Sequence, residues 1–219
     1  MDTKTDIRVA QQVASALKSN GVPYVFGMPG GGSSIDLIEA CRSQNIPFIL
    51  LQHETAAALM AVVCGELTDS CGVSLSIMAT GAANLTGGAA YAYLERHPLM
   101  CITECYGPSQ MPIMSLQKID HAQAFAAYCK DSITLGSSDA ETYINRAIQL
   151  ATSERPGPVH VDYPLDVGPF SSSHTGILPE TNDSPTIYML LNKGMVPDIY
   201  SVVFKKSSKI IEKMKKSKI

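Results

Sequence analysis

Short apolar runs alternate with helix-like stretches along most of the chain, and this alternation restricts the possible folds more than any other feature. Several of the runs are apolar throughout, as expected for strands that are buried on both faces. The intervening stretches place apolar residues at helical spacing. The sequence therefore predicts an α/β fold, with a six-stranded parallel sheet and helices on both faces. The expected strands are 24–26, 48–51, 72–78, 99–103, 132–135 and 159–163.

The expected helices alternate with these strands. A Gly-rich turn over residues 27–32 follows the first strand, and Ser33 or Ser34 is expected to cap the helix after it. The spacing of these glycines matches neither a dinucleotide-binding loop nor a Walker loop. The expected helices are 7–19, one that holds residues 35–41, 54–67, 81–94, 120–129 and 139–153.

Composition divides the chain into a domain, a linker and a tail. Apolar residues make up 45% of the chain and charged residues 17%, which is enough for a sizeable core. Residues 168–185 are rich in Ser, Pro, Thr and Gly, so we expect a domain over 1–167, a linker over 168–185 and an atypical basic tail over 186–219.

Charge is distributed unevenly between these parts. Residues 205–219 contain seven lysines and one glutamate, which leaves a net charge of −9 on the rest of a chain whose total is −3. An acidic domain argues against nucleic-acid binding. The tail is compatible with a solvated segment or with a basic amphipathic helix at a membrane surface.

The cysteines and the first residues of the chain indicate a compartment. The six cysteines form no CxxC pair and have no metal-ligand spacing with histidine, which favours reduced thiols and gives no metal site. The first residues are polar and include acids, so they resemble neither a signal peptide nor a transit peptide. No apolar run approaches the length of a membrane span. We therefore expect a cytoplasmic protein with no transmembrane segment.

A polar triplet, Gln52-His53-Glu54, separates the second expected strand from an alanine-rich helix. A carboxylate at such a junction is partly desolvated, which disfavours its charged form, while the helix N-terminus favours that form. Glu54 is therefore a candidate for proton transfer. The alternative is that Glu54 is a helix-start acid that only stabilises the helix dipole.

Three further motifs accompany this triplet, and together they resemble a known family. The motifs are 21–31 (GVPYVFGMPGG), 81–85 (GAANL) and 155–164 (RPGPVHVDYP). In this order and at this spacing they resemble the pyrimidine-binding domain of thiamine-diphosphate-dependent enzymes, over about residues 6–167. The most similar group contains acetolactate synthase large subunits, pyruvate oxidase and benzoylformate decarboxylase.

The resemblance implies a catalytic role for Glu54. Thiamine diphosphate reacts through the carbanion at C2 of its thiazolium ring. In the family, a buried glutamate engages N1′ of the pyrimidine ring, so that the amino group of the cofactor becomes basic enough to remove the C2 proton. By resemblance, that glutamate is Glu54. The resemblance and the positions of the histidines also give cofactor-binding candidates Pro29, Gly30, Gly81, Asn84 and Arg155, and substrate-facing candidates His53, Gln117 and His121.

Several positions depart from the family pattern. Residues 78–84 read MATGAAN where the family has Ser-Gly-Pro-Gly-Ala-Thr-Asn. Leu116 and Lys118 replace the Phe and Glu that flank the family's glutamine, so the substrate specificity can differ. Arg155 corresponds to a residue associated with FAD in acetolactate synthases, which makes FAD a further candidate cofactor; a surface turn is the alternative interpretation.

The resemblance implies an acetolactate-synthase-like enzyme that decarboxylates a 2-oxo acid and transfers the acyl carbanion, and of which this chain is an incomplete part. The 219 residues contain no Gly-Asp-Gly, the segment that holds magnesium and the diphosphate in the family. We therefore expect a homo-oligomer or a partner chain that supplies the diphosphate-binding domain, and no activity from the isolated chain. The alternatives are one subunit of a split two-chain 2-oxo acid decarboxylase and a truncated, non-catalytic module that pairs with full-length relatives.

Overall fold

The computed structural model describes residues 9–108, 110–112, 114 and 116–167. The expected linker 168–185 and tail 186–219 lie outside the described residues. The described elements are α1 Val9–Ser19, β1 Val25–Met28, α2 Ser33–Ser43, β2 Phe48–Leu50, α3 Glu54–Thr68, β3 Gly72–Ser76, α4 Thr80–Glu95, β4 Leu99–Cys105, α5 His121–Phe125, β5 Ser132–Thr134, α6 Ala140–Thr152, β6 Pro158–Pro164 and the 3-10 helix Leu165–Val167.

The six strands form one sheet in the order β2-β1-β3-β4-β6-β5, and every neighbouring pair is parallel. This arrangement confirms the predicted six-stranded parallel sheet. The chain passes from β1 to β2 on one side and then returns past β1 to β3 on the other. Such a reversal leaves a crevice outside the carboxyl ends of the two strands that flank it, and α/β proteins commonly bind ligands there.

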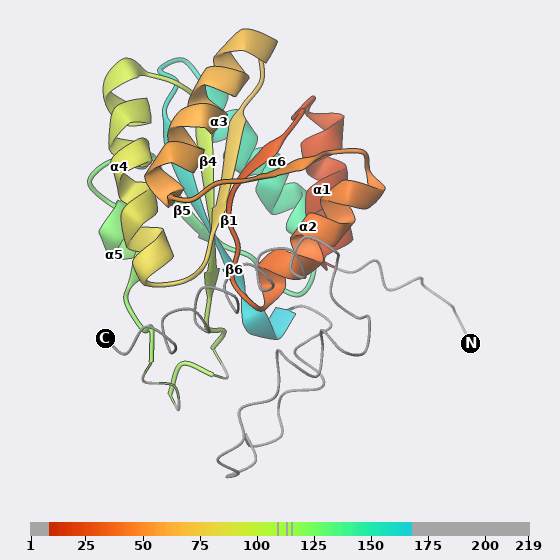
Figure 1. The fold of residues 1–219 in the computed structure, drawn as a ribbon, viewed down its shortest axis with the longest axis vertical. Coiled ribbons are helices and arrows are strands. Elements are labelled where there is room, and N and C mark those ends of the chain that lie inside the picture. Colours follow the sequence, from red (N-terminus) through yellow and green to blue (C-terminus); the bar gives the residue numbers. More distant parts are fainter. Residues whose placement is uncertain (1–8, 109, 113, 115, 168–219) are drawn as a thin grey trace, which may run out of the picture. The chain divides into compact units, whose positions relative to one another are not determined.

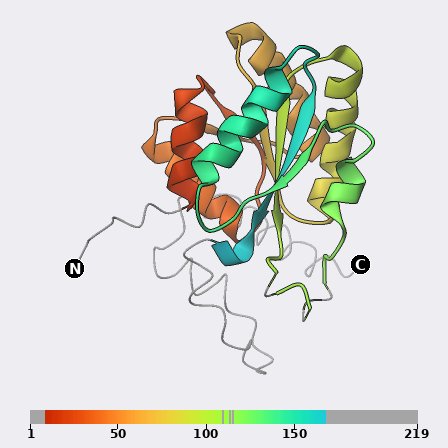
Figure 2. The same cartoon turned by 180° about the vertical axis from the view of Figure 1, so that it is seen from behind.

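Helices cover both faces of the sheet. Helices α1, α2 and α6 lie on one face and α3, α4 and α5 on the other (Figures 1 and 2). The first face is packed by large side chains such as Leu17, Leu37 and Ile144, which belong to one buried cluster. The second face uses smaller residues, such as Ala58 of α3 and Ala89 of α4, which allow these two helices to approach the sheet and each other closely. None of the described helices combines the length and the apolar character needed to cross a membrane.

Helices α3 and α5 begin at residues whose side chains accept a backbone hydrogen bond. The Thr55 amide donates to Nδ1 of His53, the N-cap of α3, at 3.2 Å. The Gln123 amide donates to Oδ1 of Asp120, the N-cap of α5, at 2.9 Å. Helix α2 differs, because its N-cap is Gly32 and no side chain of the cap residue takes part. The prediction that Ser33 or Ser34 caps α2 is therefore wrong; both are helical residues.

Candidate active site

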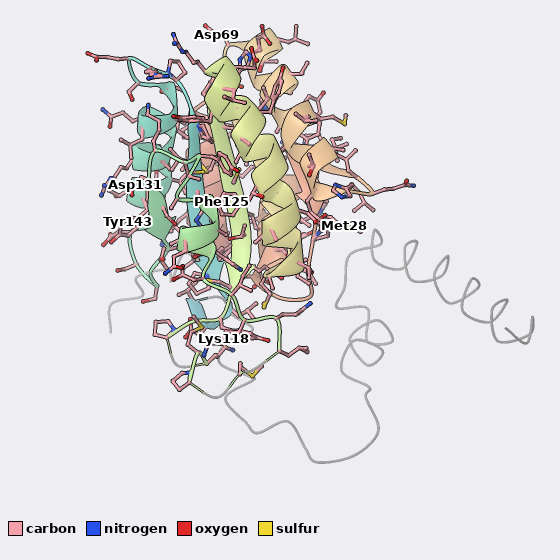
Figure 3. The ribbon with its side chains drawn as sticks, turned by 90° about the vertical axis from the view of Figure 1, so that its left-hand side faces the viewer. Met28, Asp69, Lys118, Phe125, Asp131 and Tyr143 are labelled. Carbon is pink, nitrogen blue, oxygen red and sulfur yellow. The ribbon has the colours of Figure 1, made fainter. Side chains whose placement is uncertain are left out.

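The candidate site lies at the edge of the sheet where the carboxyl ends of the strands meet. Glu54 follows β2, the Pro29–Gly30 turn follows β1, and Gly81 lies in the first turn of α4, after β3. The long loop between β4 and α5 belongs to the same edge. Figure 3 shows Lys118 of this loop at one end of the domain, whereas Asp69, which precedes β3, lies at the opposite end.

Glu54 is the first residue of α3 and only 5% of it is exposed. Its Oε2 accepts a hydrogen bond from Nδ2 of Asn84, on α4, at 3.0 Å. The Thr55 hydroxyl in turn donates to the Asn84 carbonyl at 2.5 Å, which fixes the start of α3 against α4. Among the described residues, no side chain or backbone group donates to Oε1 of Glu54. The carboxylate is thus held by one oxygen while the other stays available.

Gly81 keeps the available oxygen uncovered. A Cβ atom at Gly81 would lie 3.1 Å from Oε1 of Glu54 and 2.6 Å from Cγ2 of Ile77. A Cβ atom at Gly30 would lie 2.8 Å from Cγ1 of the same Ile77. Ile77 is half-buried, and its side chain lies next to both Gly30 and Gly81. The two glycines and Ile77 form a cradle next to the carboxylate in which larger side chains would not fit.

A second buried carboxylate, Glu104, lies on the other side of this cradle. Glu104 belongs to β4 and is 1% exposed. Its Oε1 accepts from the Gly32 amide at 3.0 Å, from the Ser34 amide at 2.8 Å and from the Ser34 hydroxyl at 2.6 Å. Glu104 thus provides, from a distant strand, the cap that α2 lacks. A Cβ at Gly30 would lie 1.8 Å from Oε2 of Glu104, so only glycine allows this approach.

The environment of Glu104 shifts its acidity. Burial raises the pKa of this carboxyl above its ordinary value, although the hydrogen bonds from Ser34 and Gly32 act to lower it. The sequence analysis missed Glu104. The available signal was an acid at the end of an apolar strand, the same kind of signal that identified Glu54.

A polar network is buried between β4, β6 and α5. His121, the first residue of α5, accepts the Ala79 amide at Nε2, at 3.0 Å, and its Nδ1 lies 2.7 Å from Oδ1 of Asp162. The Thr103 hydroxyl donates to the same Oδ1 at 2.8 Å and also lies 2.8 Å from Nε2 of His160. The network places His121 beneath the turn from β3 to α4.

The protonation of this network follows from burial and from its own charges. Burial lowers the pKa of His160 to about 4; the charge of Asp162 opposes the shift, and His121 adds to it. Burial acts to raise the pKa of Asp162, but the hydrogen bonds from His121 and Thr103, together with the two neighbouring histidine rings, hold it below its ordinary value. The network therefore favours a carboxylate at Asp162 and a neutral ring at His160.

The remaining candidates lie apart from Glu54 or at the rim of the site. His53 is exposed, with Nδ1 occupied by the Thr55 amide. Gln117 is exposed in the loop after β4. Arg155 is exposed between α6 and β6, and because β6 begins at Pro158 it lies at the amino edge of the sheet, opposite Glu54. The structure thus places Gly81 and Asn84 against Glu54 and Gly30 against Glu104 and Ile77, and it does not bring Arg155 to them.

A carboxylate of this kind, dry and held by one oxygen at a sheet edge, suits proton exchange with a ligand. Comparison with known proteins identifies the family of the chain. Residues 7–124 match the family described as thiamine pyrophosphate enzyme, N-terminal TPP binding domain. The chain belongs to this family. Its Pro29–Gly30 turn, Glu54, Gly81 and Asn84 all lie within the matched residues.

The chain is also similar in sequence to individual acetolactate synthase large subunits. The chain is 32% identical over 160 residues to a probable acetolactate synthase large subunit of Methanocaldococcus jannaschii, a match that covers 72% of this chain and 27% of that protein. It is 33% identical to the acetolactate synthase isozyme 2 large subunit of Escherichia coli K12, over 72% of this chain and 29% of the relative.

A third match extends further along this chain. The acetolactate synthase large subunit of Buchnera aphidicola subsp. Schizaphis graminum is 30% identical over 209 residues, which cover 94% of this chain and 35% of that subunit. The chain therefore spans about a third or less of the length of these curated relatives.

Proposed function

We propose that this chain forms the pyrimidine-binding half of a thiamine-diphosphate-dependent enzyme that decarboxylates a 2-oxo acid and transfers its acyl group. The observation that carries the proposal is the Glu54 carboxylate. Asn84 holds its Oε2 at 3.0 Å, and the cradle of Gly81, Ile77 and Gly30 leaves Oε1 accessible. This arrangement suits a ligand that exchanges a single proton at a ring nitrogen.

The residues present fit the cofactor that the family binds. When bound, thiamine diphosphate supplies a thiazolium ring that acts as electron sink for the decarboxylation. Glu54 would hold or accept a proton at Oε1, toward N1′ of the pyrimidine ring. Asn84 would keep the carboxylate oriented through Oε2. Gly81 and Gly30, together with Pro29, would admit the ring because neither glycine carries a Cβ that would fill the cradle.

Substrate contacts are proposed for two exposed residues at the same edge of the domain. His53 immediately precedes Glu54, and Gln117 lies in the loop after β4. Both side chains can reach a 2-oxo acid that approaches from solvent. Arg155 is proposed only as a contact for FAD, and its position at the opposite edge of the sheet means that such a contact would be separate from Glu54.

A partner is proposed to supply the magnesium and diphosphate site. Helices α3 and α4 are apolar on their inner faces, and they also expose large apolar residues on their outer faces, which is typical of helices that are covered on both sides. The outer residues of α3, which include Leu59, Met60, Val63 and Leu67, line a groove of about 740 Å³. The exposed apolar residues of these helices are Leu59, Met60, Val63, Leu67, Tyr91, Tyr93 and Leu94. The partner is a second copy of this domain or a chain that carries the diphosphate-binding domain.

A cytoplasmic location is part of the proposal. All six cysteines are free, as expected in a reducing compartment. Burial also raises the pKa of Cys41, Cys71 and Cys101 to about 12, so these thiols are unreactive.

Calorimetry with thiamine diphosphate and magnesium tests the proposed function. We expect no heat of binding from the isolated chain and saturable binding once a chain that contains the Gly-Asp-Gly segment is added. Glu54→Gln should weaken this binding, whereas Glu66→Gln, an exposed change on the same helix α3, should not. A complex that forms but takes up no cofactor would contradict the proposal and identify a non-catalytic module.

A further inference from the structure

Ala79 adopts a backbone conformation that alanine rarely takes. Its φ is 53° and its ψ is −99°, at the residue that immediately precedes α4. An L-residue with a side chain is strained at such a positive φ, whereas glycine is not. Strain of this kind persists only where the surrounding structure enforces it, and it is concentrated at functional sites. The first turns of α4 carry Gly81 and Asn84, which both meet Glu54.

His121 provides the contact that enforces this conformation. The Ala79 amide lies 3.0 Å from Nε2 of His121, and both groups are buried. Because an amide can only donate, Nε2 carries the lone pair and the proton of the neutral ring is on Nδ1. That nitrogen lies 2.7 Å from Oδ1 of Asp162. Asp162 therefore selects the tautomer of His121 that can accept from Ala79.

The rest of the network completes a consistent set of hydrogen bonds. The Thr103 hydroxyl gives its one proton to Asp162, so Nε2 of His160 must donate to Thr103. Nδ1 of His160 then accepts from the Ser132 hydroxyl at 2.6 Å. The ring of Phe125, on α5, stacks on His160 with centroids 4.3 Å apart.

The same hydrogen bonds also decide whether these residues need to be interpreted as a metal site. His121, His160 and Asp162 place ligand atoms within 4.8 Å of one another, a spacing that a metal ion could use. With both rings neutral, however, each ring nitrogen already has a hydrogen-bond partner of the correct kind. Positioning of the polypeptide accounts for the arrangement without an ion.

We propose that His121, oriented by Asp162, is a positioning residue that holds Ala79 at positive φ and thereby places Gly81 and Asn84 against Glu54. The expected effect on catalysis rests on the proposed function of Glu54, whereas the contact between His121 and Ala79 does not depend on it. Without the imidazole, Ala79 would relax to a negative φ and rotate the first turn of α4. Asn84 would then leave the Glu54 carboxylate. His121 acts through the backbone and does not need to touch a substrate.

A rescue experiment on the full chain tests the proposal without cofactor. The variants are His121→Ala, Ala79→Gly and the double variant, with His97→Ala as a control in the turn between α4 and β4. The signals are the side-chain amide of Asn84 and the ring nitrogens of His121 in ¹⁵N nuclear magnetic resonance spectra. We expect His121→Ala to move the Asn84 signals toward those of a solvated amide. Ala79→Gly in the same chain should return them, because glycine adopts the required φ unaided.

The outcomes separate positioning from a general structural role. In wild type, the Nδ1 signal should be that of a protonated nitrogen and the Nε2 signal that of an unprotonated one. Unchanged Asn84 signals in His121→Ala, or a double variant that shows no return, would overturn the proposal. If His121→Ala does not fold, His121→Phe provides the same comparison, since its ring fills the site but cannot accept from the Ala79 amide.

Activity of the assembled enzyme gives a second, separate readout. His121→Ala should lower kcat by about 10- to 100-fold through misplacement of the groups around Glu54, with a smaller change in KM. The double variant should recover to within about threefold of wild type, since the geometry returns. An equal loss of kcat in the single and double variants would contradict positioning. Failure of the complex to bind cofactor would count against the proposed function alone, because the resonance measurement does not depend on it.

Discussion

At the scale of single residues, Glu104 explains how a turn without a side-chain cap stays in place. Its Oε1 receives three hydrogen bonds from Gly32 and Ser34, and Gly30 packs directly on the carboxyl group. Glu104 and Glu54 are the two buried glutamates among the described residues. Ile77 lies next to Gly30, which packs on Glu104, and next to Gly81, which packs on Glu54. Glu104 thus positions the wall of the cradle that faces Glu54.

Replacement of Glu104 by alanine should destabilise the domain. The Gly32 and Ser34 amides and the Ser34 hydroxyl would lose their acceptor, and we expect a loss of about 3 kcal/mol in the free energy of unfolding, measured with urea. Glu39→Ala, on the surface of α2, should cost less than about 1 kcal/mol, because it removes only an exposed ion pair with Arg42. Equal losses in the two variants would show that Glu104 does not hold the turn.

His160 should make stability depend on pH. Its pKa is lowered to about 4 by burial, so between that pH and about 6.5 the unfolded state binds a proton that the folded state does not. The free energy of unfolding should therefore fall as the pH falls through this range, by about 3 kcal/mol at most. Asp162, whose pKa is lowered, adds to the loss at the acid end, and Glu104, whose pKa is raised, opposes it.

Urea midpoints at pH 7 and pH 5 measure this dependence. His160→Gln should flatten it, since the amide has no proton to gain in the unfolded state. A decline of the same size in wild type and in His160→Gln would assign the dependence to other groups.

At the scale of elements, the outward faces of α3 and α4 carry the prediction of a partner. Leu67 is 80% exposed and Val63 48% exposed, on the helix that begins with Glu54. The double change Val63→Glu and Leu67→Glu should raise the dissociation constant of the assembly at least about tenfold, because it would bury two charges. Light scattering over a range of concentrations measures the change. Leu116→Glu, at a residue 73% exposed in the loop after β4, is the matched control.

An assembly that resists the α3 change but dissociates with Leu116→Glu would place the interface elsewhere. A chain that is monomeric at all concentrations and binds no partner would contradict the proposed use of this face.

The elements themselves were largely predictable from the sequence, because each strand is an apolar run between turn residues. The expected strand 159–163 corresponds to β6 Pro158–Pro164, and the expected helix 54–67 to α3 Glu54–Thr68. The cap of α2 was not predictable, since its acceptor, Glu104, lies 70 residues from Ser34 along the chain. The strained turn at Ala79 likewise depends on His121, 42 residues away.

In the candidate site, Glu54 was predictable from the sequence, whereas the roles of the residues that hold its surroundings in place were not. Glu54 was identified because local sequence, an apolar strand followed by a helix, already places its carboxylate at the sheet edge. The roles of Glu104 and Asp162 depend on contacts between β4, α2 and α5, which no local pattern reports. The segment 78–84 departs from the family at residues just before Gly81, and the structure shows that this turn is held by a contact from α5.

At the scale of the whole molecule, residues 1–167 are proposed to fold without the remainder of the chain. Both buried clusters among the described residues are formed within 9–167. Deletion of residues 168–219 should leave a cooperative thermal transition, with a midpoint within about 5 °C of the full chain, since a shift of that size corresponds to about 1–2 kcal/mol. A truncated protein that is insoluble, or that unfolds without a transition, would show that residues 168–219 complete the core.

The turnover of pyruvate tests most directly whether Glu54 is the proton-handling residue of a thiamine-diphosphate enzyme. Carbon dioxide release would be measured with thiamine diphosphate and magnesium, for the chain alone and for its complex with a chain that carries the Gly-Asp-Gly segment. We expect none from the chain alone, turnover from the complex, and a loss of about 100-fold or more with Glu54→Gln, while Glu66→Gln stays near wild type. Activity of the Glu54→Gln complex within a few-fold of wild type would contradict the assignment.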